Sequence, residues 1–252
     1  MVDRETRRLS FGSVAADYDR YRPFPPPQAL DWIIPPDASA ILDLAAGTGV
    51  VTRKLVGRAA RVYAVEPDER MRAVLAARCP GAEVLDGRGE DIPLPDASVD
   101  AVVISAAWHW LDPERSVPEI TRVLRVGGTL GVLWTSRDDR VPWVAEFNAL
   151  ARESREADRP REGSPGRRRR EVKFPPGTPL SSPEERRVAF SLPMTSEQLA
   201  GLLGTYSGVI TLAPERRADF SRRVRTFLDR QPWDEADVPM ICRCLRSTRL
   251  PG

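Results

Sequence analysis

The sequence predicts an α/β fold, a doubly wound and mostly parallel sheet of seven strands with an antiparallel hairpin-like pair at one edge. Over the first 135 residues, short apolar runs alternate with segments of helical spacing. Strands that alternate with helices of this length form parallel sheets with right-handed crossovers. Beyond that point, helical segments separate two further strand-like runs, 188–192 and 238–246. This change of pattern favours an antiparallel pair that closes the sheet edge.

The expected strands are short, apolar and followed by turns or acids, and they cover residues 40–44, 61–65, 84–85, 99–104, 129–134, 188–192 and 238–246. Apolar residues at helical spacing predict helices over 28–34, 50–56, 69–78, 114–124, 144–151, 196–203 and 216–228. The run 99–104 is almost continuously apolar, which is typical of a strand buried on both faces. Gly127 and Gly128 are expected to end the helix before strand 129–134. Thr195 and Gln198 predict a capping box.

Three parts of the chain differ in composition. Residues 1–36 are polar and then rich in proline, which predicts an N-terminal cap segment with a rigid exit. Residues 37–252 are expected to form the main domain. Within it, residues 152–183 are charged and rich in Pro and Gly, and they include the run Arg167–Arg170. A segment of this length and composition predicts a mobile insertion.

Composition limits the classes of function. The 38 basic and 36 acidic residues leave a net charge of +2, so no global charge favours nucleic acid or an anionic membrane. No apolar run approaches the ~20 residues of a membrane span. The charged first residues lead into no apolar segment, so a secretory signal is not expected. The three cysteines show no zinc spacing and fit a reducing cytoplasm, and the arginine-rich, lysine-poor composition suggests a GC-rich bacterial genome.

Residues 41–50 and 62–67 carry the most informative pattern. The first is an apolar run with an acid, Asp43, followed by a small-residue turn that contains Gly47 and Gly49. The second is an apolar run that ends at Glu66. Glycines let the backbone approach a ligand closely, and the following helix offers free N–H groups at its start. Glu66 could take both hydroxyls of a ribose; the alternative is a solvated acid at a strand end.

The spacing of this turn argues against a dinucleotide. A dinucleotide fingerprint requires G-x-G-x-x-G, but the third position is Thr52 when counted from Gly47 and Val50 when counted from Ala45. Asp43, just before the turn, would repel a pyrophosphate. An acid there suits a ligand with a positive end. S-adenosylmethionine has an ammonium and a sulfonium group and no phosphate, so it fits this pattern.

Asp43, Gly47 and Gly49 match the motif acid-x-Gly-x-Gly-x-Gly, and the stretch resembles the class I S-adenosylmethionine-dependent methyltransferases, which have a Rossmann-like sheet. Ala45 stands where this family usually has glycine. Segments 96–100 and 119–128 resemble later family motifs, with Val for the usual Phe and Pro. Residues 11–23 resemble the leader of a small-molecule subgroup, the trans-aconitate and malonyl-carrier carboxyl methyltransferases. The resemblance covers roughly residues 10–135, with a looser match over 188–248.

The resemblance implies further cofactor-binding residues. Asp91 would accept from the adenine amino group, and the Ile92 N–H would meet a ring nitrogen. Tyr18 and Arg22 would fold over the methionine part, with Arg22 on the carboxylate. The remaining expected contacts lie beside these positions, at Pro67, Met71, Glu90 and Ser105. Three alternatives stay open: a surface acid at Asp91, a core residue at Met71, and a leader at Tyr18 and Arg22 that makes no contact.

His109, the one histidine of the chain, lies between Trp108 and Trp110 just past the run 99–104. The ends of strands in open α/β sheets bind ligands. A neutral imidazole there could accept a proton from a hydroxyl acceptor, and the two tryptophans could wall an apolar acceptor pocket. His109 therefore has three interpretations: a catalytic base, a wall of the substrate pocket, which we favour, or a structural histidine. No metal site is expected.

These patterns predict an enzyme that moves a methyl group from S-adenosylmethionine to a small molecule, with oxygen as the favoured acceptor atom. Ser105–Trp108 stands where base-modifying methyltransferases have Asn-Pro-Pro-Tyr, so nucleic acid is a less favoured acceptor, and the run Arg167–Arg170 is interpreted as a solvated loop. Neither a membrane nor a nucleic-acid partner is expected. The alternatives are a regulatory protein that binds the cofactor without turnover and a nucleic-acid methyltransferase.

Overall fold

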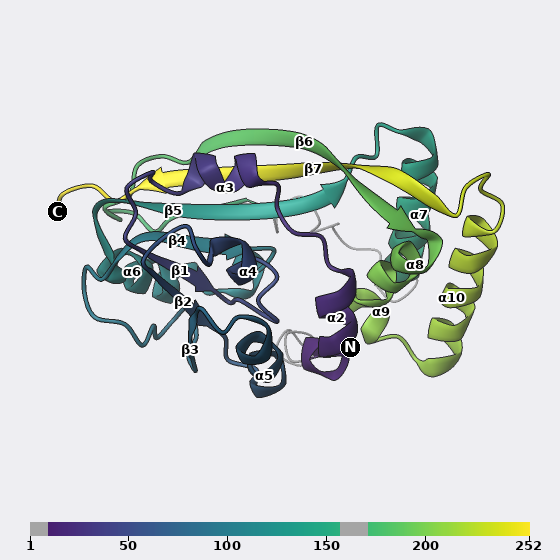
Figure 1. Cartoon of the computed structure of the whole chain (residues 1–252), viewed down its shortest axis with the longest axis horizontal. Helices are drawn as coiled ribbons and strands as arrows, with labels where there is room; N and C mark the ends of the chain where they lie inside the picture. Colours follow the sequence, from purple (N-terminus) through teal and green to yellow (C-terminus); the bar gives the residue numbers. More distant parts are fainter. Residues whose placement is uncertain (1–9, 157–170) are drawn as a thin grey trace. The chain divides into compact units, whose positions relative to one another are not determined.

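The computed structural model describes residues 10–156 and 171–252 (Figure 1). Seven strands form one sheet in the order β3-β2-β1-β4-β5-β7-β6. The strands are β1 (Ala40–Leu44), β2 (Arg61–Val65), β3 (Glu83–Leu85), β4 (Val99–Ser105), β5 (Leu124–Arg137), β6 (Glu184–Thr195) and β7 (Glu235–Thr248). The helices are η1 (Ser10–Val14), α2 (Ala15–Tyr21), α3 (Pro27–Ile33), α4 (Thr52–Leu55), α5 (Glu69–Arg78), η2 (Trp108–Trp110), α6 (Pro113–Val123), α7 (Pro142–Glu156), α8 (Ser196–Gly204), α9 (Ser207–Ile210) and α10 (Pro214–Leu228).

Strand directions confirm the predicted fold class. β1 pairs in parallel with β2 and β4, β2 with β3, and β4 with β5. The next strand, β7, runs against β5, because the Gly127 N–H donates to the Arg249 carbonyl and the Asp138 N–H to the Pro239 carbonyl. The arrows of β5 and β7 point in opposite directions in Figure 1. The sheet is thus mostly parallel, with antiparallel pairing toward the β6 edge.

Some elements differ in length from the prediction. The helix expected over 50–56 is reduced to the single turn α4, because Gly49 has a φ of +83° and the turn from β1 continues to Val51. The prediction that Gly127 and Gly128 end a helix was wrong. α6 ends at Val123 and β5 begins at Leu124, so both glycines lie in the strand. Gly127, with a φ of +83°, lies where the β4–β5 register is irregular.

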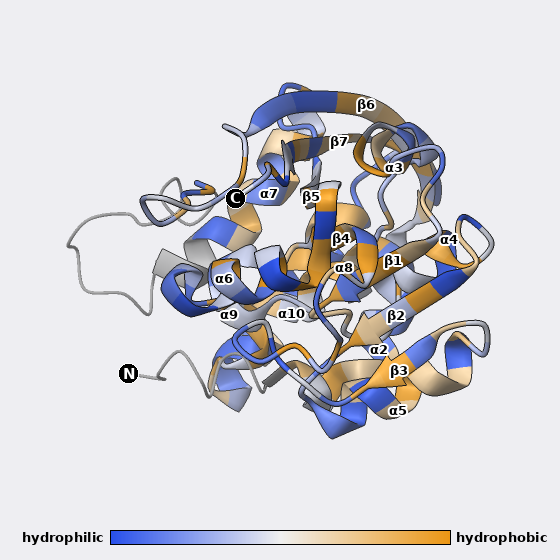
Figure 2. Ribbon diagram, turned by 90° about the vertical axis from the view of Figure 1, so that its left-hand side faces the viewer, coloured by the Kyte–Doolittle hydropathy of each residue, from blue (hydrophilic) through white to orange (hydrophobic). Residues whose placement is uncertain are grey.

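The described chain divides into two compact units. The sheet unit contains residues 23–135, 171–188 and 242–252, and the helical unit contains residues 10–22, 136–156 and 189–241. In the sheet unit, every residue of the central strand β1 is buried, and most residues of its neighbours β2 and β4 are buried too. Figure 2 shows hydrophobic colours along β4, whereas β6 begins with hydrophilic residues. The candidate site described below belongs to the sheet unit.

Residues 171–183, the second part of the predicted insertion, pack on the sheet unit. Leu180 is buried in its core, and the ring of Phe174 lies edge-on to Trp108 at 6.1 Å. The Ser181 N–H donates to the Thr248 carbonyl and the Leu250 N–H to the Pro179 carbonyl. This part of the segment is therefore anchored by side chains and backbone. Residues 157–170, with the run Arg167–Arg170, lie outside the described residues, and the mobility of the segment stays a prediction.

The helical unit has its own apolar core, built on α7, α8 and α10 around Phe147, Leu199 and Phe220. Thr195 and Gln198 form the predicted capping box at the start of α8. Gly201 of α8 allows the ring of Tyr21 to lie against the helix, because a Cβ at this position would come within 2.5 Å of that ring. α2 is thereby fixed on α8, which positions Tyr18 and Arg22 within this unit.

Cys242 and Cys244 share one buried face of β7, and their sulfur atoms are 3.7 Å apart without a disulfide. Within the described residues, no helix is long and apolar enough to cross a membrane. The same residues contain no cluster of His, Cys, Asp and Glu that could hold a metal ion.

Candidate cofactor and acceptor site

Acidic and polar residues gather at the carboxyl ends of three adjacent strands. Asp43 lies in β1 opposite Val103 of β4, and Glu66 directly follows β2. Ser105 is the last residue of β4 and is half-buried. Because the three strands are parallel neighbours, these ends meet at one edge of the sheet, the edge where open α/β sheets bind ligands. The topology thus brings together residues that lie far apart in the sequence.

The turn after β1 is held in an uncommon backbone conformation. Ala45, Gly47 and Gly49 have φ values of +57°, +59° and +83°. For a residue with a Cβ atom this left-handed region costs roughly 1–2 kcal/mol. Ala106, after β4, has a φ of +55°, so two neighbouring strand ends each carry an alanine in this region. Backbone strain of this kind clusters at ligand sites.

Packing against α5 fixes the end of this turn. A Cβ at Gly49 would come within 2.4 Å of a methyl carbon of Leu75 and 2.7 Å of the Cys79 sulfur. The Cys79 thiol lies 3.7 Å from the Gly49 carbonyl oxygen. Residues 45–47 are half-buried, whereas residues 48–50 are buried. The first half of the turn is therefore accessible to a ligand, and its second half is part of the core.

Glu66 is held by two backbone donors and is 8% exposed. One carboxylate oxygen accepts from the Gly47 N–H and the other from the Asp68 N–H, both at 2.9 Å. Glu66 thus ties the turn after β1 to the start of α5. A carboxylate has about four lone-pair positions, so these two bonds orient it and are compatible with acceptance from ribose hydroxyls. Glu66 is therefore not the solvated acid at a strand end that was the alternative to a ribose-binding residue.

Asp43 is 1% exposed and accepts a hydrogen bond of 2.6 Å from the Thr52 hydroxyl. Burial raises the pKa of Asp43 to about 7, and the nearby charge of Glu66 contributes in the same direction, against the hydrogen bonds from Thr52. Two carboxyl groups near one another in a low-dielectric site disfavour the doubly ionised state. A cation placed beside Asp43 would relieve this cost.

Thr48, between the two glycines, is a candidate residue that the sequence reasoning did not identify. Its side chain is fully buried, and its hydroxyl oxygen has no hydrogen-bond partner within the described residues. A buried polar atom without a partner costs about 1–3 kcal/mol. Such an atom in a ligand-binding turn marks a place where a ligand or an ordered water would complete the hydrogen bonding.

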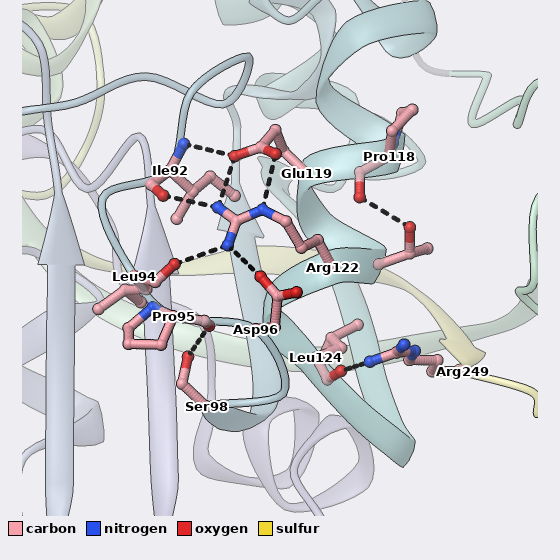
Figure 3. A network of polar contacts seen from close by, with 11 residues as sticks. Ile92, Leu94, Pro95, Asp96, Ser98, Pro118, Glu119, Arg122, Leu124 and Arg249 are labelled. Atoms are coloured by element: carbon pink, nitrogen blue, oxygen red, sulfur yellow. Dashed lines mark hydrogen bonds and ion pairs between the residues drawn. The ribbon is translucent and has the colours of Figure 1, made fainter.

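The hydrogen bonds in the loop after β3 differ from those expected. The Ile92 N–H, expected to meet the adenine ring, donates to the Glu119 carboxylate at 2.9 Å. Figure 3 shows why: Arg122 bridges Glu119 and Asp96 and also donates to the Ile92 carbonyl. The Ile92 side chain is buried in the core, so this residue has a structural role here.

The neighbouring acids differ in their environment. A Glu90 oxygen accepts from the Asp112 N–H at 2.9 Å and so connects the loop to the N-cap of α6. Asp91 is exposed, and its N–H and carbonyl both bond to the backbone of Arg88. Asp91 is thus accessible to a ligand, whereas Glu90 has a structural partner. No sequence signal separates these two roles.

The start of α5 lies next to Glu66. Asp68 caps the helix by accepting from the Arg70 and Met71 N–H groups. Pro67 is half-buried, and Met71 is 4% exposed. Met71 therefore belongs mainly to the packed interior, the alternative considered for it above.

The three residues of η2 differ in exposure. Trp108 is 3% exposed and packs in the sheet core against Phe174. His109 and Trp110 are half-buried, with ring centroids 4.7 Å apart at a tilt of 43°. Trp108 therefore anchors η2 in the sheet core. His109 and Trp110 are the two residues of η2 that are partly exposed.

Tyr18 and Arg22 belong to the helical unit. The Arg22 guanidinium lies over the Tyr18 ring, 4.6 Å from its centroid, and it donates to the hydroxyl and the carbonyl of Thr205. Tyr18 also packs edge-on against Phe11. The N-terminal segment is therefore ordered through specific contacts from residue 11 onward.

Comparisons with known proteins agree with this architecture. Residues 42–132 match the family model described as a methyltransferase domain. The matched residues include the end of β1, the turn and Glu66. An uncharacterized methyltransferase of Mycobacterium tuberculosis is 39% identical over 249 residues, covering 97% of this chain and 98% of the relative. An uncharacterized methyltransferase of Schizosaccharomyces pombe is 27% identical, covering 96% of this chain and 98% of the relative.

Among solved structures, a putative type II methyltransferase from Anaeromyxobacter dehalogenans superposes with a TM-score of 0.65 at 26% identity. The superposition covers 92% of this chain and all of that chain. The mostly parallel sheet and the relatives that match nearly the whole chain therefore indicate the same family. The chain belongs to the class I S-adenosylmethionine-dependent methyltransferases.

Proposed function

We propose that this protein transfers a methyl group from S-adenosylmethionine to a small-molecule acceptor, with oxygen as the acceptor atom, in a bacterial cytoplasm. The observation that carries the cofactor assignment is the pair of buried carboxyls, Asp43 and Glu66, on either side of a left-handed turn. Thr48 adds a buried hydroxyl without a partner in the described residues. The residues present fit a cationic nucleoside, because they offer acceptors and close backbone approach and place no basic side chain in the turn.

Each residue has a separate role in this proposal. Glu66, oriented by the Gly47 and Asp68 N–H groups, accepts from the ribose hydroxyls. Asp43 stabilises the positive end of the ligand, and Asp91 accepts from the adenine amino group. When bound, the cofactor would supply a methyl group attached to a sulfonium sulfur. That sulfur is already activated as the leaving group. The protein then mainly positions the acceptor, an effect that can supply ~7–11 kcal/mol.

We expect Glu66→Gln to weaken S-adenosylhomocysteine binding about 10- to 100-fold, the effect of losing hydrogen bonds to a charged group worth ~1.5–3 kcal/mol. The glutamine amide can accept from only one of the two N–H groups that Glu66 serves. Calorimetry with S-adenosylhomocysteine and with its 2′,3′-dideoxyribose analogue separates ribose contacts from distortion of the turn. If Glu66 meets the hydroxyls, the variant loses affinity for the natural ribose and little for the analogue.

Glu69→Gln is the matched control for this experiment. Glu69 is an exposed acid three residues away, in the first turn of α5, so its charge is lost without a change in the turn. Equal weakening of both ligands by Glu66→Gln would show that Glu66 only supports the turn. Unchanged affinity for both would remove Glu66 from the cofactor site.

His109→Gln is expected to raise KM for the acceptor and to leave kcat within a few-fold of the natural enzyme. His109 is half-buried beside Trp110, as suits a residue that lines a pocket and binds ground state and transition state alike. Steady-state kinetics with an acceptor found by screening labelled cofactor against metabolites provides the measurement. A base would instead contribute about 10²–10⁴-fold to kcat, so a collapsed kcat at unchanged KM would overturn our interpretation.

A further inference from the structure

Trp134 of β5 carries a buried hydrogen-bond donor that the fold leaves unused. The residue is 5% exposed, and its indole Nε1 atom is buried without a hydrogen-bond partner within the described residues. The indole nitrogen can only donate, and a buried tryptophan N–H usually has a partner. A buried donor without a partner is unfavourable. A ligand atom that accepts from Trp134 would therefore bind more tightly than one that meets a solvated donor.

Trp134 lies at the carboxyl end of β5, the same sheet edge as the candidate site. Ser105, the last residue of β4, is the partner of Leu133 in the β4–β5 ladder, and the Ala106 N–H donates to the Leu133 carbonyl at 2.8 Å. Ala106 has the left-handed φ of +55°, and such strain clusters at ligand sites. Trp134 directly follows the residue that contacts this strained strand end. These residues all belong to the sheet unit.

The place of β5 in the sheet separates Trp134 from the proposed nucleoside site. β4 lies between β1 and β5. Neighbouring strands are about 4.8 Å apart, so the ends of β1 and β5 are about 10 Å apart. The turn after β1 and Glu66 lie on one side of β4, and Trp134 lies on the other. A ligand at Trp134 is therefore distinct from the nucleoside held at Glu66, and its position beside β4 is the one expected for the acceptor.

Aromatic rings gather at this end of the sheet unit. Trp134 belongs to the same apolar cluster as Trp108, and the partly buried side chains of Trp110 and Phe174 pack against that cluster. The ring of Phe174 lies edge-on to Trp108 at 6.1 Å. Aromatic rings contact other aromatic rings favourably in offset and edge-to-face arrangements. The surroundings of the unused donor therefore favour an aromatic ligand.

An ion pair of the neighbouring strands covers the Trp134 ring. The guanidinium carbon of Arg243 in β7 lies 5.5 Å from the ring centroid, and Arg243 donates to the Glu185 carboxylate of β6 at 2.7 Å. This cover fixes the indole, and a preorganised donor loses little freedom when a ligand binds. Because Glu185 compensates the charge of Arg243, an anionic ligand gains little from that cation. A neutral oxygen is the acceptor group that suits the neutral N–H.

We propose that the Trp134 N–H binds the methyl acceptor, and that this acceptor is an aromatic molecule with a neutral hydroxyl or carbonyl oxygen. We thereby narrow the acceptor of the proposed function, on which this step rests, to one chemical class. This class differs from the carboxylates methylated by the subgroup that residues 11–23 resemble. A buried donor selects a ligand that satisfies it, because an analogue without the oxygen leaves the N–H unpaired. Trp134 would thus select and orient the acceptor without moving a proton.

The test compares 2-naphthol, which has the oxygen, with naphthalene, which lacks it, in calorimetry with S-adenosylhomocysteine bound. Trp134→Phe keeps an aromatic ring and removes the N–H. We expect it to weaken 2-naphthol binding about 5- to 150-fold, the scale of a buried donor that gains or loses its partner, and to change naphthalene binding little. Site-specific replacement of Trp134 by 3-benzothienylalanine, in which sulfur replaces the N–H, should have the same effect at almost unchanged side-chain volume.

The indole proton of Trp134 provides a readout that does not depend on affinity. Its NMR resonance is the one that Trp134→Phe lacks. It should move downfield when 2-naphthol binds and much less when naphthalene binds, because both ligands add an aromatic ring but only one accepts the hydrogen bond. Equal weakening of both ligands, or equal shifts with both, would show that Trp134 only fills space. A natural protein that does not bind 2-naphthol would overturn the proposed acceptor class.

Trp32→Phe is the matched control, because it makes the same chemical change in the sheet unit, at a partly exposed position in α3. It should leave the affinity for both ligands unchanged. Binding of S-adenosylhomocysteine to the natural protein tests the proposed function separately. If S-adenosylhomocysteine does not bind, the proposed function is wrong. If it binds and Trp134→Phe affects 2-naphthol no more than naphthalene, only the role of Trp134 is wrong.

Discussion

Replacing Asp43 by asparagine is expected to stabilise the protein, and to stabilise it more at pH 8 than at pH 5. Burial raises the pKa of Asp43 to about 7 from the 3.8 of an exposed aspartate, so the folded protein holds a proton that the unfolded chain has released. Stability therefore falls as pH rises through 7. Integrated from pH 5 to pH 8, this amounts to about 2.5 kcal/mol in the free energy of unfolding.

Asparagine imitates the protonated aspartate, because its side-chain oxygen still accepts from the Thr52 hydroxyl and it carries no charge. The free energy of unfolding of both proteins is measured in urea at pH 5, 6, 7 and 8. The difference between the two proteins isolates the titration of Asp43, because the other titratable groups contribute equally to both. Glu185, whose pKa the Arg243 guanidinium holds at about 2, stabilises the fold above its unfolded pKa and loses that effect only in acid. It lies outside this pH window.

The titration of Asp43 should also change the affinity for the proposed cofactor. A cationic ligand beside Asp43 favours the ionised carboxyl, so the affinity for S-adenosylmethionine should rise by up to tenfold per pH unit below 7 and level off above it. In Asp43→Asn the affinity should be low and nearly independent of pH. Asp86→Asn is the control, because the side chain of Asp86 is 72% exposed in a surface pair with Arg72. Identical pH profiles for the natural protein and Asp43→Asn would contradict the assignment.

Local patterns account for much of the fold. Residues 40–44, 61–65 and 69–78 were predicted to the residue, because each is an apolar or amphipathic run bounded by a turn, an acid or a cap. The start of β5 was not, because Gly127 adopts its left-handed conformation within a strand whose irregular register depends on β4. Glycine in a sequence signals a break in regular structure, but it does not tell which element is interrupted.

The candidate site divides in the same way. Asp43, Gly47, Gly49 and Glu66 were identified because their spacing along the chain is itself the signal. The partner of the Ile92 N–H was not, because Glu119 lies 27 residues away. Thr48 stands out because its buried hydroxyl has no hydrogen-bond partner within the described residues, a property of packing that no local pattern carries. Asp43 was identified by position, whereas its raised pKa follows from its complete burial.

The turn after β1 allows two opposite substitutions to be compared. Gly49→Ala should lower the free energy of unfolding by about 2–5 kcal/mol, the sum of left-handed strain and overpacking. Its φ is +83°, and the added methyl would come within 2.4 Å of Leu75 and 2.7 Å of Cys79. Ala45→Gly should stabilise by up to about 1 kcal/mol, because relief of strain at a φ of +57° exceeds the entropy that glycine adds to the unfolded chain.

Urea unfolding of both variants, and of Gly49→Ala combined with Cys79→Ala, separates the two causes of the Gly49 effect. Backbone strain is the same in either background, whereas overpacking against the sulfur is relieved when Cys79 is truncated, so the double variant should cost less than the two single changes together. If the free-energy changes of Gly49→Ala and Cys79→Ala add strictly, backbone strain and the contact with Leu75 are the whole cause of the Gly49→Ala effect. A Gly49→Ala variant as stable as the natural protein would contradict the packing of α5 on this turn, and with it the rigid support on which the proposed cofactor site depends.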